Sequence, residues 1–182
     1  MLATLPRRPA LVHAANSAAA LRGAAYAADL VRPGIFLYGG MAGSIAPRTV
    51  AALRTRVVAV RTVGKGDTVS YGATWRAPSP TTIATLGLGY ADGFLRASKD
   101  GGPSSGTPAR VVELGGSVVP VVGRVTMDLT MVAVEGKAAV GDVATVFGGM
   151  ISLDQQAEAA GTISYELLTA LGSRVPRRYS AA

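Results

Sequence analysis

The N-terminal quarter of the chain alternates apolar runs with a helix-forming segment. The apolar run Leu11–Ala15 predicts a buried strand. Asn16 or Ser17 is suited to cap an alanine-rich helix over residues 18–28. A second apolar run, Ile35–Tyr38, predicts another extended piece. This rhythm is typical of βα units, and the segment is too short to form a sheet by itself.

From residue 48 onward the pattern changes to short runs rich in β-branched residues, separated by glycine turns. Gly115 and Gly116 stand between two such runs and predict a tight hairpin. Several short strands at this spacing predict a barrel or a sandwich. The expected strands are Val57–Val63, Thr68–Tyr71, Thr81–Leu88, Arg110–Leu114, Ser117–Val122, Val125–Val134 and Asp142–Phe147.

Two short helices are predicted near the C-terminus. Ser152 and Gln155 have the spacing of a capping box and predict a helix that ends at Gly161. Ser164 is suited to cap a second helix that runs through Leu171.

The fold class that follows from these patterns is mainly β. We expect a β-domain over residues 48–182, preceded over residues 1–47 by a partial α/β piece that ends in a Gly- and Ser-rich linker. Within the β-domain, residues 100–107 are rich in Gly, Pro and Ser and predict a mobile loop.

Composition excludes several classes of site. The chain has no cysteine, so a disulfide, a thiolate metal site and a cysteine nucleophile are excluded. Its one histidine, His13, excludes a two-histidine zinc site within the chain, and we expect no metal. No apolar run approaches the ~20 residues that a membrane span needs, and the first residues lack the order of a secretory signal. We therefore expect a cytoplasmic protein without a membrane partner.

The charge balance is basic, with 18 Lys and Arg against 11 Asp and Glu. Nucleic acid is an obvious partner for a net charge of +7. The basic residues nevertheless occur singly or in pairs, and aromatic residues, at 5% of the chain, do not alternate with them. We therefore expect no nucleic-acid partner.

Two features near the N-terminus suit an anion. Asn16 and Ser17 at a helix start offer polar side chains and unpaired backbone N–H groups, which can hold a phosphate. Arg32 lies beside a turn at Gly34 whose backbone can approach a ligand closely. Each feature can equally be an ordinary cap or an ordinary turn.

The β-domain carries further polar candidates. Tyr90 lies on a glycine-flanked loop, where a tyrosine can act as a general acid or base or simply pack. Asp128 follows a Gly-Arg-Val-Thr-Met segment and can equally be the partner of a salt bridge. Tyr165 and the Arg174–Arg177 segment are similarly open.

The order of the motifs is more specific than any one of them. In order they are His-x-x-Asn-Ser-Ala, Arg-Pro-Gly-Ile-x-Leu-Tyr-Gly, Ser-Tyr-Gly-Ala-Thr-Trp, Gly-Tyr-Ala-Asp-Gly, Val-Gly-Arg-Val-x-Met-Asp, Ile-Ser-Tyr-Glu-Leu and Arg-Val-Pro-Arg. From about His13 to Tyr179, this series resembles the C-terminal half of bacterial alanine racemase. That family has an N-terminal (β/α)8 barrel that holds pyridoxal 5′-phosphate, a C-terminal β-domain, and a head-to-tail dimer.

The resemblance implies that the chain comprises the last βα elements of the barrel and the entire C-terminal β-barrel-like domain. The implied activity is the interconversion of L- and D-alanine, which supplies D-alanine for peptidoglycan. The implied pyridoxal phosphate contacts come from both parts of the chain. The residues that would surround the phosphate are Asn16, Ser17, Gly34, Ile35 and Tyr165, while Arg32 would face the pyridine nitrogen with hydrogen-bond support from His13.

The resemblance also implies residues that act on the substrate. A racemase needs a base on each face of the substrate, because the proton leaves from one side and returns to the other. Tyr90 would be one of these two bases and would work on the cofactor of the partner subunit. Met127 would help to bind the substrate carboxylate, and Asp128 would support that loop.

One departure from the family is severe. The lysine that forms the Schiff base lies near the start of the barrel, in a region that these residues do not match, together with an arginine that helps to hold the substrate and a histidine beside the tyrosine base. None of Lys65, Lys99 and Lys137 lies in a matching motif. We therefore expect this polypeptide alone to have little or no racemase activity.

Three interpretations remain open. The chain can be a truncated, split or partial alanine racemase that forms a homodimer. It can instead be a non-catalytic β-domain that keeps a dimerisation surface and pairs with a full-length racemase subunit. The motifs also do not distinguish alanine from another small amino acid such as serine. In each case residues 1–45 are expected to be loose, or docked in a manner unlike the family, because they have few neighbours to pack against.

Overall fold

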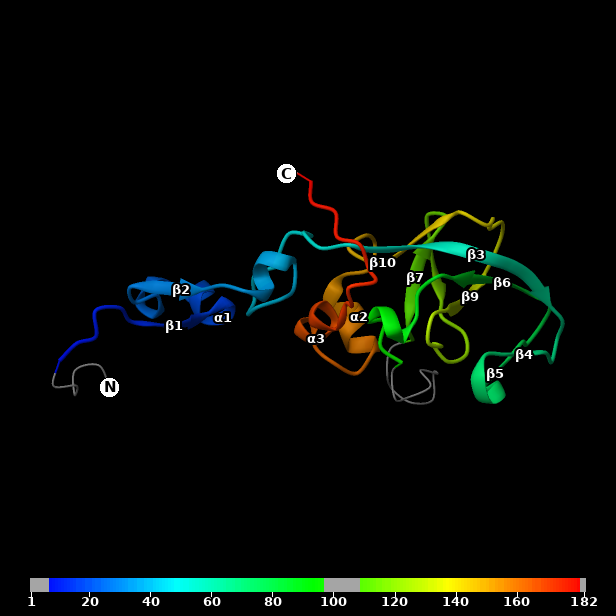
Figure 1. The fold of residues 1–182 in the computed structure, drawn as a ribbon, viewed down its shortest axis with the longest axis horizontal. Helices are drawn as coiled ribbons and strands as arrows, with labels where there is room; N and C mark the ends of the chain where they lie inside the picture. The colour runs from blue at the N-terminus through cyan, green and yellow to red at the C-terminus, as the bar shows by residue number, and fades with distance from the viewer. Residues whose placement is uncertain (1–6, 97–108, 181–182) are drawn as a thin grey trace. The chain divides into compact units, whose positions relative to one another are not determined.

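A computed structural model of the chain describes residues 7–96 and 109–180 (Figure 1). The predicted mobile loop at residues 100–107 lies outside the described residues. The chain divides into two compact units, Met1–Val50 and Ala51–Ala182. The domain bounds that the sequence predicts, 1–47 and 48–182, stay a prediction.

The first unit is built around one parallel strand pair. Strands β1 and β2 pair in parallel, with His13 opposite Leu30 and Asn16 opposite Arg32. A strand, a helix and a parallel strand form a βαβ arrangement. The elements are β1 (His13–Asn16), α1 (Ser17–Leu21), the 3₁₀ turn η2 (Ala24–Tyr26), β2 (Leu30–Arg32) and the 3₁₀ turn η3 (Ile35–Tyr38).

Two expectations for this unit are wrong in detail. The helix expected over residues 18–28 ends after Leu21, because Gly23 has a φ of 120°, which is incompatible with helix. The run Ile35–Tyr38 forms a 3₁₀ turn instead of an extended piece. The amide of Gly34 donates to the Ser17 hydroxyl at 2.8 Å. Because of this hydrogen bond, the chain leaves the direction of β2 before Ile35.

The second unit is an antiparallel sheet with two helices (Figure 1). Six strands pair in the order β8-β7-β10-β3-β6-β9, and β4 pairs with β5 in a small separate ribbon. The strands are β3 (Leu53–Val63), β4 (Thr68–Val69), β5 (Trp75–Arg76), β6 (Thr81–Leu86), β7 (Val111–Leu114), β8 (Ser117–Pro120), β9 (Thr130–Val134) and β10 (Val143–Phe147). The helices are α2 (Leu153–Ala159) and α3 (Ser164–Ala170), and the 3₁₀ turns are η4 (Tyr71–Ala73) and η5 (Tyr90–Asp92).

The two edge strands of this sheet meet. Val121, which follows β8, forms an antiparallel bridge with Val132 of β9. The amide of Val122 also donates to the carbonyl of Met131 at 2.8 Å. These contacts connect the edges and make the sheet a near-barrel, so the expectation of a mainly β fold is confirmed and the barrel is favoured over the sandwich.

Aliphatic side chains fill the interior of the second unit. A core cluster also lies beneath the β4–β5 ribbon, where Trp75 and Ala133 pack against it. Its buried members are Val63, Val69, Ala77, Ile83, Val122 and Met131. This cluster anchors the ribbon and with it the turn at η4.

Of the local features predicted for the second unit, the hairpin and the first helix cap are confirmed and the second helix cap is not. Gly115 and Gly116 have φ values of 60° and 77° and join β7 to β8 in the predicted hairpin. The capping box is also confirmed, because Gln155 N donates to Ser152 Oγ at 3.1 Å and Ser152 N donates to Gln155 Oε1 at 2.8 Å. Ser164, however, is the first residue of α3 and not its cap, since its hydroxyl donates to Asp154 instead.

Gln156 joins α2 to the sheet. Its side chain is 1% exposed, and its amide nitrogen donates to the carbonyls of Val111 at 2.6 Å and Val146 at 2.7 Å. Val111 belongs to β7 and Val146 to β10, so one side chain holds the helix against two neighbouring strands.

We expect Gln156→Ala to lower the free energy of unfolding by about 2–4 kcal/mol, because two buried carbonyl oxygens lose their donor and a void remains. The matched change Gln155→Ala, at an exposed cap position, should cost about 1 kcal/mol or less. Urea unfolding followed by circular dichroism measures both. Equal losses for the two variants would contradict the role of Gln156.

Candidate functional site

The turn that carries Tyr90 lies directly against the segment that carries Met127. A Cβ built at Gly89 would lie 2.3 Å from the carbonyl oxygen of Met127 and 2.5 Å from the amide nitrogen of Asp128. The amide of Tyr90 donates to the carbonyl of Thr126 at 3.0 Å, and the amide of Ala91 donates to Met127 at 2.9 Å. The structure therefore brings together three predicted site residues, Tyr90, Met127 and Asp128.

The same turn is fixed from within. The Asp92 carboxylate is almost buried and accepts the Gly89 amide at 2.9 Å, which closes the turn. Gly93 continues it with a φ of 100°, and a Cβ there would lie 2.4 Å from the carbonyl oxygen of Ala170. The turn is thus packed between the Met127 segment on one side and the end of α3 on the other.

Arg174 connects two of these segments through charge. Its Nη2 donates to Asp128 Oδ1 at 2.7 Å, and its Nε lies 3.3 Å from Asp92 Oδ1. The hydrogen bond to Asp128, with the added charge of Asp92, raises the pKa of Arg174 above its usual value. Asp128 is therefore a salt-bridge partner, which is one of the two roles that the sequence left open for it.

Arg177 fixes the chain that carries Arg174. Its guanidinium donates to the carbonyls of Leu171 at 2.7 Å, Gly172 at 2.5 Å and Val175 at 2.7 Å. Leu171 is the C-cap of α3, and Gly172 and Val175 follow it, so these bonds fix the chain that leaves the helix. The Arg174–Arg177 segment therefore holds the Tyr90 turn in place through the contact of Arg174 with Asp92.

Sequence reasoning assigned no role to a second tyrosine turn, which also meets the loop before Met127. Ser70 Oγ donates to the carbonyl of Arg124 at 2.5 Å, and a Cβ at Gly123 would lie 2.6 Å from the carbonyl oxygen of Val69. A Cβ at Gly72 would lie 3.1 Å from Arg124 Nη1, so a guanidinium lies beside this turn.

The backbone of this second turn is strained. Ser70, Gly72 and Ala73 have φ values of 70°, 71° and 48°, a region that non-glycine residues rarely adopt. Tyr71 lies between them with a side chain that is 59% exposed, compared with 39% for Tyr90. Such strain gathers at functional sites, so Tyr71 is a candidate that the sequence reasoning missed. Tyr71 belongs to the motif Ser-Tyr-Gly-Ala-Thr-Trp, which is one of the motifs that resemble the family. That motif is the feature of the sequence that could have identified it.

The predicted phosphate residues of the first unit lie around the start of α1. Asn16 caps the helix by accepting the Ala19 amide at 3.0 Å. The buried Ser17 hydroxyl accepts the Gly34 amide and, at 3.5 Å, the Phe36 amide. Asn16, Ser17, Gly34 and the buried Ile35 therefore lie close together, and their role toward a phosphate stays a prediction.

Arg32 and His13 lie on the paired strands of the same unit. Arg32 Nη2 donates to the carbonyl of Ala14 at 3.1 Å, and both side chains are exposed. The hydrogen bond that the structure shows for Arg32 is thus to the backbone, and the predicted bond to His13 stays a prediction. Tyr165 belongs to the second unit, on the first turn of α3, with a side chain that is 48% exposed.

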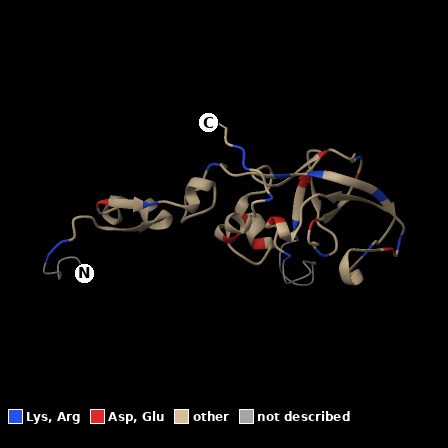
Figure 2. Ribbon diagram, in the orientation of Figure 1, with Lys and Arg blue, Asp and Glu red and all other residues tan. Residues whose placement is uncertain are grey.

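Charge and metal-binding groups are sparse over the described residues. Lysine and arginine are spread along many elements and form no single basic track (Figure 2). Within residues 7–96 and 109–180, no group of three or more His, Cys, Asp or Glu side chains could hold a metal ion. None of the helices in this part of the chain is long and apolar enough to cross a membrane.

The fold and these loops define a domain of an amino-acid racemase, and comparison with known proteins agrees. Residues 50–179 match the family model "Alanine racemase, C-terminal domain", and residues 1–42 match "Alanine racemase, N-terminal domain". The chain belongs to the alanine racemase family, and the resemblance seen in its motifs is confirmed.

Curated relatives and solved structures show the extent of the match. The chain is 45% identical to the alanine racemase of Rhizobium meliloti, over 91% of this chain and 46% of that protein. It superimposes on the biosynthetic alanine racemase of Pseudomonas aeruginosa with a TM-score of 0.80 at 39% identity, covering 92% of this chain and 47% of the other. For the alanine racemase of E. faecalis the TM-score is 0.83 at 31% identity, covering 98% of this chain and 48% of the other. The chain therefore spans less than half the length of these relatives.

We expect Gly89→Ala to lower the free energy of unfolding by about 2 kcal/mol or more, because the methyl group would overlap the Met127 backbone and force the two segments apart. Gly64→Ala is the control, since its Cβ would meet only the Asp67 side chain, with Oδ2 at an ordinary 3.4 Å. Its effect should be about 0.5 kcal/mol. Urea unfolding measures both. A Gly89→Ala protein as stable as the Gly64→Ala protein would show that the close approach is absent.

Proposed function

We propose that this chain is the C-terminal part of a pyridoxal-phosphate-dependent alanine racemase. The reaction would interconvert L- and D-alanine for peptidoglycan synthesis, in the cytoplasm, by a dimer. The observation that carries the proposal is the convergence of the Tyr90 turn, the Tyr71 turn and the Met127 segment in a chain that belongs to this family. The name of the Rhizobium meliloti relative supports alanine as the substrate over serine.

The residues at the start of α1 fit a phosphate group. The Ser17 hydroxyl accepts hydrogen bonds from Gly34 and Phe36, so its own proton is available for an anion. A Cβ built at Gly34 would meet nothing within 4 Å, so open space adjoins this turn. Asn16, Ser17, Gly34 and Ile35 would hold the phosphate through hydroxyl and backbone N–H groups.

Pyridoxal phosphate, when bound, supplies an electron-withdrawing ring that eases removal of the α-proton of an amino acid. Arg32 would lie beside the pyridine nitrogen and keep a positive charge there, with His13 in support. Met127 would position the substrate carboxylate through its segment, whose place Asp128 and Arg174 fix by their ion pair. A tyrosine would carry the proton on its phenol oxygen.

Two tyrosines are candidates for the residue that carries the proton. Tyr90, the residue assigned from the sequence, lies on a turn that is hydrogen-bonded throughout and has ordinary backbone angles at Gly89. Tyr71 is more exposed, lies on strained backbone and has the Arg124 guanidinium beside its turn. We propose Tyr71 as the proton-transferring residue and Tyr90 as a residue that shapes the site.

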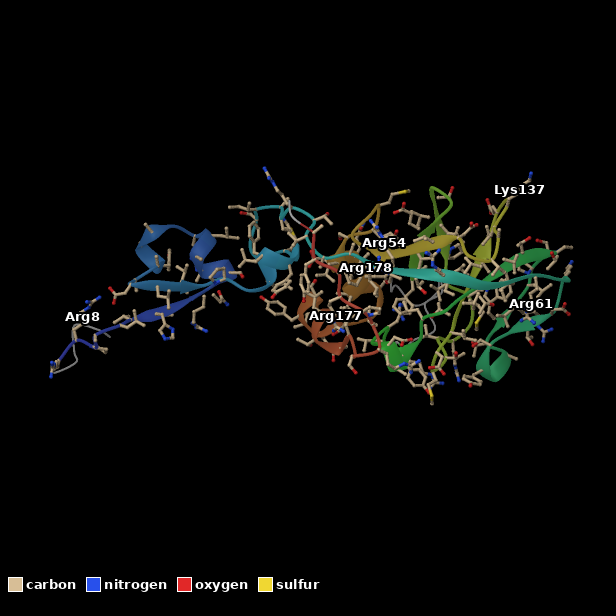
Figure 3. The ribbon with its side chains drawn as sticks, turned by 45° about the horizontal axis from the view of Figure 1, so that its top comes forward. Arg8, Arg54, Arg61, Lys137, Arg177 and Arg178 are labelled. Atoms are coloured by element: carbon tan, nitrogen blue, oxygen red, sulfur yellow. The ribbon has the colours of Figure 1, made fainter. Side chains whose placement is uncertain are left out.

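A second candidate function rests on the lysines. Lys65 lies in an exposed turn after β3, and Lys137 lies in an exposed turn after β9 (Figure 3). Neither lysine stands in one of the motifs that resemble the family, so we assign a Schiff base to neither. A non-catalytic domain that pairs with a full-length racemase subunit would need no lysine of its own.

The proposal is tested in a chimera that joins the first half of the Rhizobium meliloti racemase to this chain. We expect the chimera to racemise alanine in the presence of pyridoxal phosphate. Tyr71→Phe should lower kcat by about 10²-fold or more, because the phenol proton carrier is lost. Tyr90→Phe should have a smaller effect, and Tyr38→Phe, at another exposed tyrosine, is the matched control.

An inactive but folded chimera would count against the racemase proposal as a whole. An active chimera in which Tyr90→Phe is the more damaging change would restore the assignment made from the sequence. Circular dichroism and unfolding curves of each variant separate loss of chemistry from loss of fold.

A further inference from the structure

The segment that follows α3 is anchored to the Tyr90 turn by its backbone. The amide of Gly172 donates to the carbonyl of Asp92 at 3.2 Å. Arg177 closes a bend in the same segment through its bonds to three backbone carbonyls. Arg174 therefore belongs to a bend that is already fixed beside Asp92.

The Met127 segment forms a small turn that is closed at its base. The amide of Thr126 donates to the carbonyl of Leu129 at 2.9 Å, and the amide of Leu129 donates to Thr126 Oγ1 at 3.1 Å. Met127 and Asp128 lie between these two residues and form the tip of the turn. Because the base is closed, a force on the Asp128 side chain also acts on Met127.

One edge of the Arg174 guanidinium contacts two carboxylates that belong to different segments. Nη2 donates to Asp128 Oδ1 at 2.7 Å, while Nε lies 3.3 Å from Asp92 Oδ1. The other oxygen of Asp92 accepts the Gly89 amide at 2.9 Å. Because the guanidinium is planar and rigid, its two donors set the spacing between the tip and the Tyr90 turn.

The ion pair at the tip contributes little to the free energy of unfolding. The side chains of Arg174 and Asp128 are 54% and 52% exposed, so water screens their attraction. The consequence of this contact is therefore the position of the tip, since the donors of an arginine have fixed directions.

We propose that Arg174 is a positioning residue that sets the affinity for the substrate carboxylate by holding the tip in place. This inference rests on the proposed function, in which Met127 helps to bind that carboxylate. Tyr71, the proposed proton carrier, lies on a separate turn with its own hydrogen bond to the β-domain. Loss of Arg174 therefore weakens substrate binding and leaves the proton carrier in place.

Hydrogen exchange of the whole chain tests the positioning without any activity. The amides of residues 89–91 donate to Asp92 and to the segment that carries the tip. Arg174→Met should speed their exchange by about tenfold or more, because the contact that holds the two segments together is weakened. Arg178→Met removes the same charge from an exposed position nearby (Figure 3) and should leave these rates unchanged.

Kinetics of the chimera test the consequence for binding. Arg174→Met should raise KM for alanine about tenfold and change kcat by less than about threefold, which is the pattern of lost substrate binding. Arg174→Lys keeps the charge but offers one nitrogen to two carboxylates, so it should recover only part of the KM. Arg178→Met should change neither constant.

A double variant separates indirect from direct action. If Arg174 acts through Asp128, then Asp128→Asn should itself raise KM, and Arg174→Met should add much less in that background than it does alone. Effects that multiply in full would mean that Arg174 attracts the alanine carboxylate directly, which would overturn the positioning role.

Two further results would overturn the proposal. These are unchanged exchange of residues 89–91 in Arg174→Met, and a fall in kcat at unchanged KM. A folded but inactive chimera refutes the racemase proposal and, with it, the role of Arg174 in alanine binding. The hydrogen exchange of the chain then shows by itself whether Arg174 holds the tip.

Discussion

The contact between Gly89 and the Met127–Asp128 peptide determines the geometry of the candidate site. A hydrogen atom is the only side chain that fits at Gly89, because a methyl carbon would lie 2.3 Å from a carbonyl oxygen. Its backbone angles are ordinary, so size alone requires glycine there. The hydrogen bonds from the Tyr90 turn to Thr126 and Met127 depend on this approach, and so does the reach of Arg174 to both Asp92 and Asp128.

The loop of residues 123–128 is the common partner of both tyrosine turns. At one end Gly123 and Arg124 contact the strained Tyr71 turn, and at the other end Thr126 and Met127 accept the amides of the Tyr90 turn. A near-barrel suits this arrangement, because its closure through Val121 and Val132 places the loop immediately after a fixed strand contact. The rigid sheet thereby positions three exposed segments that the chain separates widely, as loops on a scaffold commonly carry function.

Features that depend on a few neighbouring residues could be predicted from the sequence. The Gly115–Gly116 hairpin and the Ser152–Gln155 capping box each need only local geometry, and both are present. The pattern of short β-branched runs likewise gave the mainly β class. Within the first unit, Asn16 and Ser17 do lie at a helix start, beside Gly34.

Features that depend on distant contacts could not be predicted. The run Ile35–Tyr38 has the composition of a strand but turns, because the Gly34 amide bonds to Ser17 instead of a neighbouring strand. Arg174 reaches Asp92 and Asp128 across long stretches of chain, and nothing local marks Arg110 as buried. The strain at Ser70 and Ala73 is likewise imposed by packing and leaves no pattern in the sequence.

We propose that these residues carry cofactor contacts and a proton-transferring tyrosine but no lysine suited to the cofactor. The most direct test is D-alanine formation from L-alanine by the purified 182-residue chain with added pyridoxal phosphate, with the lysine-bearing chimera as the positive control. We expect no turnover above that of the cofactor alone. Steady formation of D-alanine would mean that Lys65, Lys99 or Lys137 reaches the cofactor, and would contradict this proposal.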